Sequence, residues 1–255
     1  MVSPGYRLHP QACFPQVNIK TFQEQWNALG ASDPMWAVLT DPAKTGNRWD
    51  RDEFFASGVA EVEMIWQRLQ KLRIDIRPGT AIDFGCGLGR LTQALCAHFE
   101  KCMGIDISES MVQKAREYNQ FPDKCSYLVN AAPDLGQIPD HSADFVFSRI
   151  ALQHTATAFQ KQYVSDFLRI LKPGGVAYFH VIQPTFLRRL IPDFFIEKYR
   201  QWKHGGKPFI SMYGLSESEV KRIVAAHGAV ILDCLIEPYG GFESRWSNYS
   251  WCVRK

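Results

Sequence analysis

The glycine-rich turn 85–89, Gly-Cys-Gly-Leu-Gly, has the residue types and spacing that bring a ligand close to the backbone. Gly85, Gly87 and Gly89 lack the Cβ atoms that would keep a ligand away, and they permit the positive φ that a tight turn requires. The apolar stretch 80–84 precedes the turn, and a helix-compatible stretch follows it. A glycine pattern of this kind is weak evidence for a site when it stands alone.

A carboxylate follows the turn at a distance typical of nucleoside binding. Asp106 lies 19 residues after Gly87, at the end of the second apolar stretch. In a doubly wound sheet, an acidic residue there accepts hydrogen bonds from ribose hydroxyls, so the turn and Asp106 predict a nucleoside-containing ligand. The alternative, that Asp106 only caps the next helix, is the weaker one because Ser108 is better placed as the N-cap residue.

Details of the turn favour S-adenosylmethionine over a dinucleotide. The spacing is Gly-x-Gly-x-Gly, whereas a dinucleotide fingerprint is Gly-x-Gly-x-x-Gly/Ala, and Arg90 stands where that fingerprint needs a small residue. Asp83, just before the first glycine, suits the ammonium group of a methionine moiety by charge-assisted hydrogen bonding. The same carboxylate would be poorly placed beside a pyrophosphate.

From about Phe54 to its C-terminus, the chain resembles the class I S-adenosylmethionine-dependent methyltransferases. Residues 83–89 are similar to the family's first motif and residues 104–108 to its second. Residues 143–148 are similar to the fourth strand, and residues 171–175 to the turn before the fifth. The resemblance implies S-adenosyl-L-methionine as cofactor and S-adenosyl-L-homocysteine as product.

The resemblance also implies a set of cofactor-binding residues. The methionine end would lie at Asp83, Gly85 and Gly87, the ribose at Asp106, and the adenine at Ile107 and Asn130. Asn130 and Ala131 stand where the family more often has an acidic residue, although an Asn amide can still hydrogen-bond an adenine edge. The complete expected set is Asp83, Gly85, Cys86, Gly87, Asp106, Ile107, Met111, Asn130, Ala131 and Ser148.

Alternating strands and helices predict an α/β fold with a parallel sheet. Expected strands are 80–84, 102–106, 125–130, 143–148, 175–182, 229–236 and 249–253. Expected helices are 53–72, 90–98, 109–118 and 159–171, with a fifth opened by the capping box 216–219. By resemblance, the fold is a Rossmann-like, seven-stranded, mostly parallel sheet with helices on both faces, a C-terminal antiparallel hairpin and an N-terminal helical extension.

Composition indicates a single α/β unit with additions. The chain has 255 residues, of which 46% are hydrophobic and 22% charged, and its formal charge of +3 does not by itself favour nucleic acid. No stretch approaches the ~18 apolar residues of a membrane span, and residues 1–14 lack a secretory core, so we expect a cytoplasmic protein. The seven cysteines show no metal-ligand spacing, and Cys96, Cys102, Cys125 and Cys234 are expected in the core.

Two segments lie outside the minimal fold, and both bear on substrate choice. The extension 1–55, before the methyltransferase domain 56–255, contains Trp26, Trp36 and Trp49 and would either close over the cofactor as a lid or simply pack against the sheet. The insertion 183–213 is expected to cap the active site. Its aromatic and basic residues fit an acidic small molecule, a lipid surface, nucleic acid or a solvated helix face.

Methyl transfer to a hydroxyl needs a positioned acceptor and is helped by a base. His154 is the candidate catalytic base because the loop after the fourth strand lies beside the cofactor, and His180 is the second candidate. After Ser148 the chain lacks the Asn/Asp-Pro-Pro-aromatic pattern of base and glutamine methyltransferases, and no carboxylate is placed to hold magnesium. No Pro-Cys or Thr-Cys dipeptide supplies the nucleophile of cytosine C5 methylation.

These observations predict metal-independent methyl transfer to a small-molecule acceptor, with oxygen favoured over nitrogen. The alternatives are a nicotinamide-dependent oxidoreductase, an RNA or protein methyltransferase that uses the basic cap, and a catalytically silent S-adenosylmethionine-binding subunit. Nucleic acid is not the favoured partner, and the oligomeric state is left open by the sequence.

Overall fold

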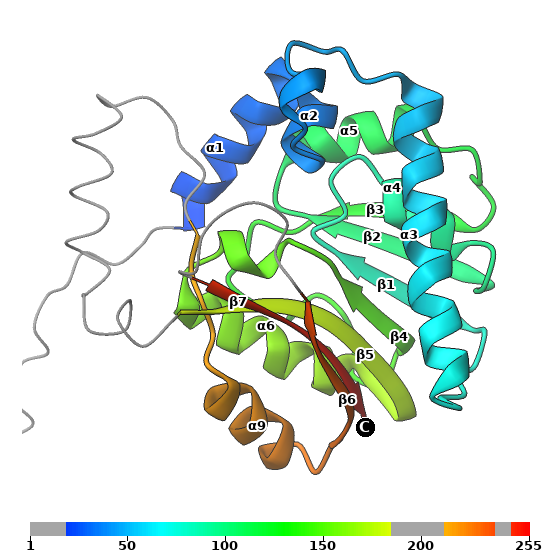
Figure 1. Cartoon of the computed structure of the whole chain (residues 1–255), viewed down its shortest axis with the longest axis vertical. Helices are drawn as coiled ribbons and strands as arrows, with labels where there is room; N and C mark the ends of the chain where they lie inside the picture. The colour runs from blue at the N-terminus through cyan, green and yellow to red at the C-terminus, as the bar shows by residue number, and fades with distance from the viewer. Residues whose placement is uncertain (1–18, 185–211, 238–245) are drawn as a thin grey trace, which may run out of the picture.

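Seven strands form one sheet in the order β3-β2-β1-β4-β5-β7-β6, in a computed structural model that describes residues 19–184, 212–237 and 246–255 (Figure 1). This arrangement confirms the predicted fold class. The strands are β1 (Thr80–Phe84), β2 (Lys101–Asp106), β3 (Cys125–Val129), β4 (Ala143–Ser148), β5 (Leu171–Pro184), β6 (Val230–Glu237) and β7 (Trp246–Arg254).

The first five strands are parallel, and their register brings the predicted ligand-binding positions to one edge of the sheet. Asp83 pairs with Gly104, and Asp106 pairs with Val129. The carboxyl ends of β1, β2 and β3 therefore lie side by side, where ligands of doubly wound sheets bind. β7 is antiparallel to both β5 and β6, which confirms the C-terminal antiparallel hairpin.

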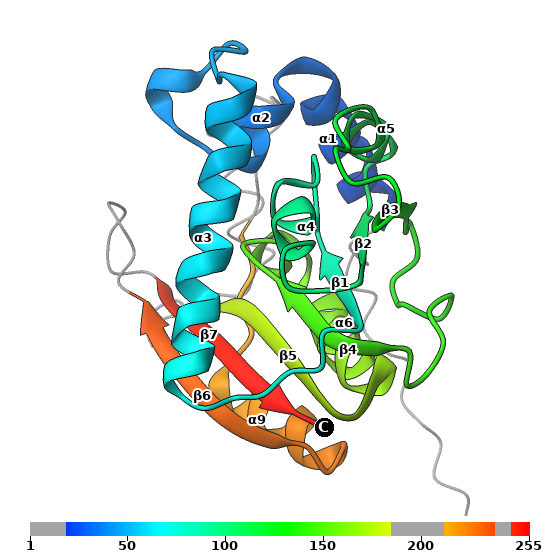
Figure 2. The same cartoon turned by 90° about the vertical axis from the view of Figure 1, so that its right-hand side faces the viewer.

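Helices cover both faces of the sheet (Figures 1 and 2). One face is covered by α3 (Arg51–Lys71), α4 (Arg90–Leu95) and α5 (Glu109–Glu117), whose apolar side chains pack with Phe145, Phe147 and Tyr178 of the sheet. The other face is covered by α6 (Thr157–Ile170) and α9 (Glu217–Ala226). Both cores consist of apolar residues whose removal from water stabilises the layers at about 25 cal/mol per Å².

Side-chain caps begin several of these helices where the sequence predicts them. Ser216 and Glu219 form the expected capping box of α9. Ser108 caps α5 by accepting a hydrogen bond from the Met111 N–H. Asp50 caps α3 in the same way. Each cap satisfies an N–H group that the helix itself leaves without a partner, and each is worth about 1 kcal/mol.

The N-terminal extension contributes two helices, α1 (Ile19–Ser32) and α2 (Pro34–Val38), followed by the 3-10 turn η1 (Pro42–Lys44). Both views place them at the end of the molecule where α5 lies (Figures 1 and 2). Gly30 lets α1 approach α5 closely, because a Cβ there would overlap the Ser110 side chain. Asn27 adds a polar link, since its backbone oxygen accepts from Ser110 Oγ at 2.9 Å.

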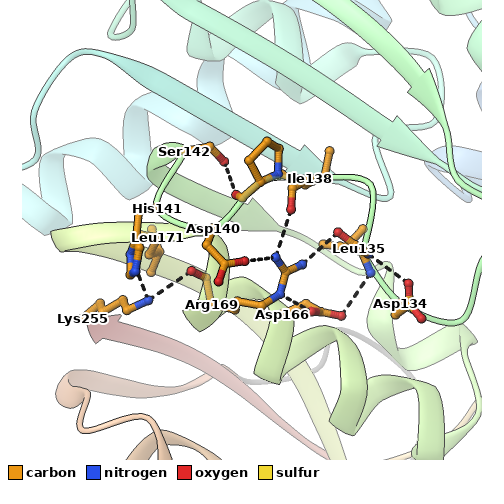
Figure 3. Close-up of polar contacts among 12 residues, drawn as sticks. Asp134, Leu135, Ile138, Asp140, His141, Ser142, Asp166, Arg169, Leu171 and Lys255 are labelled. Carbon is orange, nitrogen blue, oxygen red and sulfur yellow. Dashed lines mark hydrogen bonds and ion pairs between the residues drawn. The ribbon is translucent and has the colours of Figure 1, made fainter.

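Arg169 of α6 holds the connection between β3 and β4 in place (Figure 3). Its guanidinium donates to the backbone oxygens of Leu135 at 2.8 Å and Ile138 at 2.9 Å. It also pairs with the carboxylates of Asp140 and Asp166. These contacts fix residues 135–140 of the loop against α6.

The structure differs from the sequence prediction at a few boundaries. β5 starts at Leu171 instead of 175, because the chain stays in the sheet through a register shift at which Gly174 adopts a φ of +82°. α4 ends at Leu95, three residues early, because the next residues bond to carbonyls three positions back. Cys234 was expected in the core but is exposed on the edge strand β6.

No helix among the described residues has the length and apolar character needed to cross a membrane.

Candidate active site

A cavity lies at the carboxyl edge of the sheet, where β1, β2, β3 and β4 end. It contains about 790 Å³ of space not filled by atoms, a volume that includes the open solvent at its mouth. Its wall consists of residues from α1, α2, α5 and α6, the strand ends, the glycine turn and the loop after β4. The lining residues are Trp26, Ala37, Val38, Phe84, Gly85, Gly87, Ile105, Asp106, Ile107, Met111, Asn130, Arg149, Ile150, Ala151, His154, Thr155 and Tyr163.

The glycine turn forms one side of this cavity. Gly85 has a φ of +76° and Gly87 a φ of +51°, in the left-handed region that favours glycine. A Cβ on Gly85 would overlap the Ala151 side chain, and one on Gly87 would lie 2.6 Å from Val38 Cγ2. The turn is tied to β2 because the Gly85 N–H donates to the Ile105 oxygen at 2.7 Å. Glycine is therefore required by both conformation and space.

Asp106 is held by the backbone on both of its carboxylate oxygens. Oδ2 accepts from the Gly87 N–H and Oδ1 from the Ser108 N–H, each at 2.8 Å. Burial raises the pKa of Asp106, while the N–H groups of Ser108, Gly87 and Ile107 lower it. A carboxylate has about four acceptor sites, so Asp106 can still accept a hydrogen bond from a ligand in the cavity.

Asp83 lies behind the turn, not in the cavity wall. It is only 1% exposed and accepts a 2.6 Å hydrogen bond from Thr92 Oγ1. Burial raises its pKa to about 7, against the lowering effects of the Thr92 hydroxyl and the Arg90 charge. A carboxyl with such a pKa changes its protonation near neutral pH, so this group is sensitive to any positive charge brought close to it.

The loop after β4 forms another part of the cavity wall, with Arg149, Ile150, Ala151, His154 and Thr155 among the lining residues. Ile150 has a φ of +59°, which is strained for a β-branched residue, and it is 38% exposed. His154, in the 3-10 turn η2 (Leu152–His154), contacts the Trp26 ring of α1 edge-on with centroids 5.4 Å apart. The Gln153 amide nitrogen lies 3.2 Å from His154 Nε2. Both neighbours restrict the orientation of the imidazole.

Comparison with known proteins agrees with this geometry. Residues 82–179, which include the glycine turn, Asp106 and the loop after β4, match the model of the family described as "Methyltransferase domain". Residues 82–179 therefore form a methyltransferase domain. Solved structures at 18% identity or below support the fold. The magnesium protoporphyrin IX methyltransferase of Synechocystis, crystallised with bound S-adenosylhomocysteine, superimposes with a TM-score of 0.61, covering 93% of this chain and 99% of that one.

Curated relatives match over longer segments than the family model. The probable S-adenosylmethionine-dependent methyltransferase CRG1 of Saccharomyces cerevisiae is 30% identical over 64% of this chain and 54% of its own. A malonyl-[acyl-carrier protein] O-methyltransferase of Hamiltonella defensa is 26% identical over 66% of this chain and 60% of its own. The chain thus spans little more than half the length of these two relatives.

Most of the predicted binding residues of the methyltransferase domain lie in the cavity wall. These are Gly85, Gly87, Asp106, Ile107, Met111 and Asn130, and the candidate base His154 lies in the same wall. Asp83 is buried behind the turn, and the Cys86 side chain is buried within the turn. Ser148 is fully buried, and its hydroxyl donates to the Phe84 oxygen at 3.1 Å. Ala131 is exposed and is not part of the wall.

Asn130 lines the cavity, but its amide already has partners within the domain. Nδ2 donates to the Asp134 oxygen at 2.9 Å, and Oδ1 accepts from Gln137 Nε2 at 2.8 Å. These bonds hold the side chain in one orientation. Nδ2 also donates to the Ala132 oxygen at 3.5 Å, which leaves the second lone pair of Oδ1 for a ligand and limits the hydrogen bonds that Asn130 can make to an adenine ring.

Sequence reasoning did not place several wall residues in the site: Trp26, Ala37, Val38, Arg149, Ile150 and Tyr163. The aromatic residues of the extension are a sequence signal for Trp26, but they do not by themselves place its side chain against the cavity. No sequence signal indicates Val38 or Tyr163, because their place in the wall depends on how α2 and α6 pack. The predicted cap 183–213 falls almost wholly outside the described residues.

Among the described parts of the chain, no group of three or more His, Cys, Asp and Glu side chains is arranged to hold a metal ion.

Proposed function

We propose that this protein transfers the methyl group of S-adenosylmethionine to a small-molecule acceptor, with a hydroxyl oxygen as nucleophile and without a metal ion. The observation that carries the proposal is the cavity in which the glycine turn and Asp106 form one wall, inside the segment that matches the methyltransferase domain. The bound S-adenosylhomocysteine of the Synechocystis neighbour supports the same cofactor here.

The residues present fit this cofactor. The Gly87 and Ser108 N–H groups hold the Asp106 carboxylate in place, and it would accept hydrogen bonds from the ribose hydroxyls. Gly85 and Gly87 line the cavity, so the methionine end could lie against their backbone. Ile107 and Met111 would provide apolar contacts for the adenine ring. Asp83 would favour the ammonium group electrostatically from behind the turn.

When bound, the cofactor supplies a methyl group that its sulfonium has already activated, so the protein must align the acceptor and exclude water. We assign His154 as the base that takes the hydroxyl proton, because it lines the cavity and Gln153 and Trp26 restrict its ring. We assign α1 and α2 to a lid, because Trp26 of α1 and Val38 of α2 line the cavity.

The relatives support the coarse substrate class. The Hamiltonella relative is named for methylation of an oxygen on a carrier-bound acyl group, and this favours an oxygen acceptor here.

Two alternatives are retained: an RNA or protein methyltransferase that uses the basic segment 183–213, and a catalytically silent cofactor-binding subunit. A cytoplasmic location is part of the same proposal and awaits localisation of the tagged protein.

Calorimetric titration with S-adenosylhomocysteine, with NADH as the control ligand, tests the cofactor. Micromolar affinity for S-adenosylhomocysteine alone is the expected result, and binding of NADH alone would overturn the proposal. Transfer of labelled methyl from S-adenosylmethionine to a panel of hydroxylated and aminated acceptors then tests the reaction. Cofactor binding without any product would favour the silent subunit, and strong, salt-dependent RNA binding would favour the macromolecular alternative.

A further inference from the structure

One carboxylate, Glu61 of α3, connects two walls of the cavity that are far apart in the sequence. Its Oε2 accepts from Arg90 Nη2 at 2.6 Å, and its Oε1 accepts from Arg149 Nε at 2.9 Å. Arg90 directly follows the glycine turn and begins α4. Arg149 directly follows the last residue of β4 and begins the loop that carries Ile150 and His154.

All three side chains are shielded from water, so their interaction is only weakly screened. The exposed fraction is 17% for Glu61, 5% for Arg90 and 11% for Arg149. Burial works to raise the pKa of Glu61, but the two guanidiniums outweigh it and lower the pKa. Glu61 therefore remains ionised and cannot lose its charge without leaving two buried cations without their shared partner.

Arg149 has a second anchor on the opposite side. Its Nη1 and Nη2 donate to the two carboxylate oxygens of Glu237 on β6 at 2.8 and 2.9 Å, and Nη1 also donates to Ser250 Oγ. The next residue, Ile150, is in the left-handed region. Arg149 is thus tied to β6 and β7 on this side, separately from its bond to Glu61.

We propose that Glu61 is a positioning residue of the cofactor site, which holds the glycine turn and the loop after β4 at the spacing that lets both contact one ligand. Glu61 itself is not in the cavity wall, so it acts through Arg90 and Arg149. The inference rests on the proposed function, since it concerns binding of the proposed cofactor in this cavity. The inference goes beyond the proposed function because it assigns a role to α3, a helix that precedes the family segment 82–179.

The chain offers a matched control for this role. Glu61→Gln and Glu237→Gln each remove one negative charge and one carboxylate partner of Arg149. Only Glu61→Gln also releases Arg90, and with it the link to the glycine turn. If the ion pairs contribute only to stability, the two variants should have similar ligand affinities. A positioning role of Glu61 predicts that Glu61→Gln binds the ligand more weakly than Glu237→Gln.

The experiment is calorimetric titration of the wild type and both variants with S-adenosylhomocysteine, combined with urea unfolding of each protein. We expect Glu61→Gln to weaken binding at least tenfold and Glu237→Gln to change it less than threefold, while both lower the urea midpoint. Equal affinity of wild type and Glu61→Gln, or equal losses in the two variants, would overturn the inference. Absence of binding by the folded wild type would instead overturn the proposed function, and this inference with it.

If Glu61→Gln does not fold, Glu61→Asp provides the decisive measurement. It keeps the charge, but its side chain is one methylene shorter and cannot reach both guanidiniums from the same backbone position. We then expect S-adenosylhomocysteine binding weakened at least threefold in a protein that unfolds cooperatively. Wild-type affinity of Glu61→Asp would show that the spacing of the two walls does not depend on this residue, and would overturn the inference.

Discussion

Replacement of Asp83 by Asn is expected to remove a large part of the pH dependence of stability between about pH 4 and pH 7. The carboxyl is 1% exposed, and burial raises its pKa from the ordinary value of 3.8 to about 7. The folded state therefore binds a proton over a pH range in which the unfolded state has already released it. The free energy of unfolding must then fall as pH rises through this range.

The size of the effect follows from the pKa difference. One pKa unit corresponds to about 1.4 kcal/mol, so a difference of roughly three units amounts to about 4 kcal/mol. The stabilisation that the folded protein gains by holding a proton on Asp83 is fully present below pH 3.8 and is lost as pH rises through about 7. Asparagine resembles the protonated carboxyl in shape and does not titrate. The stability of Asp83→Asn relative to wild type should thus rise by about 4 kcal/mol between pH 4 and pH 8.

Urea unfolding of both proteins at closely spaced pH values measures this difference. Coincident tryptophan-fluorescence and circular-dichroism transitions would establish that the two-state treatment applies to a chain of this length. With a slope of about 3 kcal/mol per M, the midpoint of the variant should move by about 1 M relative to wild type. Thr92→Val is the control, because it removes the hydroxyl bonded to Asp83 but keeps the titrating group.

Parallel pH profiles of wild type and Asp83→Asn would refute the reasoning, because they would mean that Asp83 does not titrate between pH 4 and pH 8 in the folded protein. Thr92→Val should keep the dependence and extend it to higher pH, since the Thr92 hydroxyl lowers the pKa of Asp83. Arg90, Asp106 and Glu61 also act on this carboxyl, the first lowering and the other two raising its pKa. Their charges are unchanged in both variants.

Three further predictions concern the cavity. Asp106→Ala should weaken S-adenosylhomocysteine binding by about 1 to 3 kcal/mol, because the ribose hydroxyls lose a charged acceptor; unchanged affinity in calorimetry would remove Asp106 from the site. Gly87→Ala should lower stability by about 1 to 3 kcal/mol in thermal unfolding, because of its positive φ and the contact with Val38, and Val38→Ala in the same chain should restore only part of the loss. His154→Gln should reduce turnover by about 10² to 10⁴-fold with cofactor affinity retained, and a turnover like that of wild type would show that another group takes the proton.

The elements around the glycine turn were predictable because their determinants are local. A strand, three glycines and a helix follow one another between residues 80 and 95, and each step depends on residues a few positions apart. The same holds for the capping box at Ser216. Where the prediction was wrong, tertiary context decided: Cys234 looks like a core residue in the sequence, but β6 is an edge strand that leaves it exposed.

The contacts that α1, α2 and α3 make around the cavity were not predictable, since the residues involved come from separate parts of the chain. Trp26 contacts His154 although 128 positions separate them in the sequence. Val38 covers Gly87, and a carboxylate of α3 connects Arg90 with Arg149. None of these contacts has a periodicity, a cap or a motif that would indicate it, because each depends on how helices pack against the finished sheet.

The sequence by itself thus determined the order of the strands and helices, the glycine turn and the positions of Asp83 and Asp106, because backbone preferences and hydrophobic periodicity act over short distances. Only the tertiary structure decided which of these groups face the cavity, how far burial shifts the pKa of Asp83, and which charges Glu61 joins. Burial and charge pairing are properties of the folded chain, since both depend on atoms brought together from distant positions.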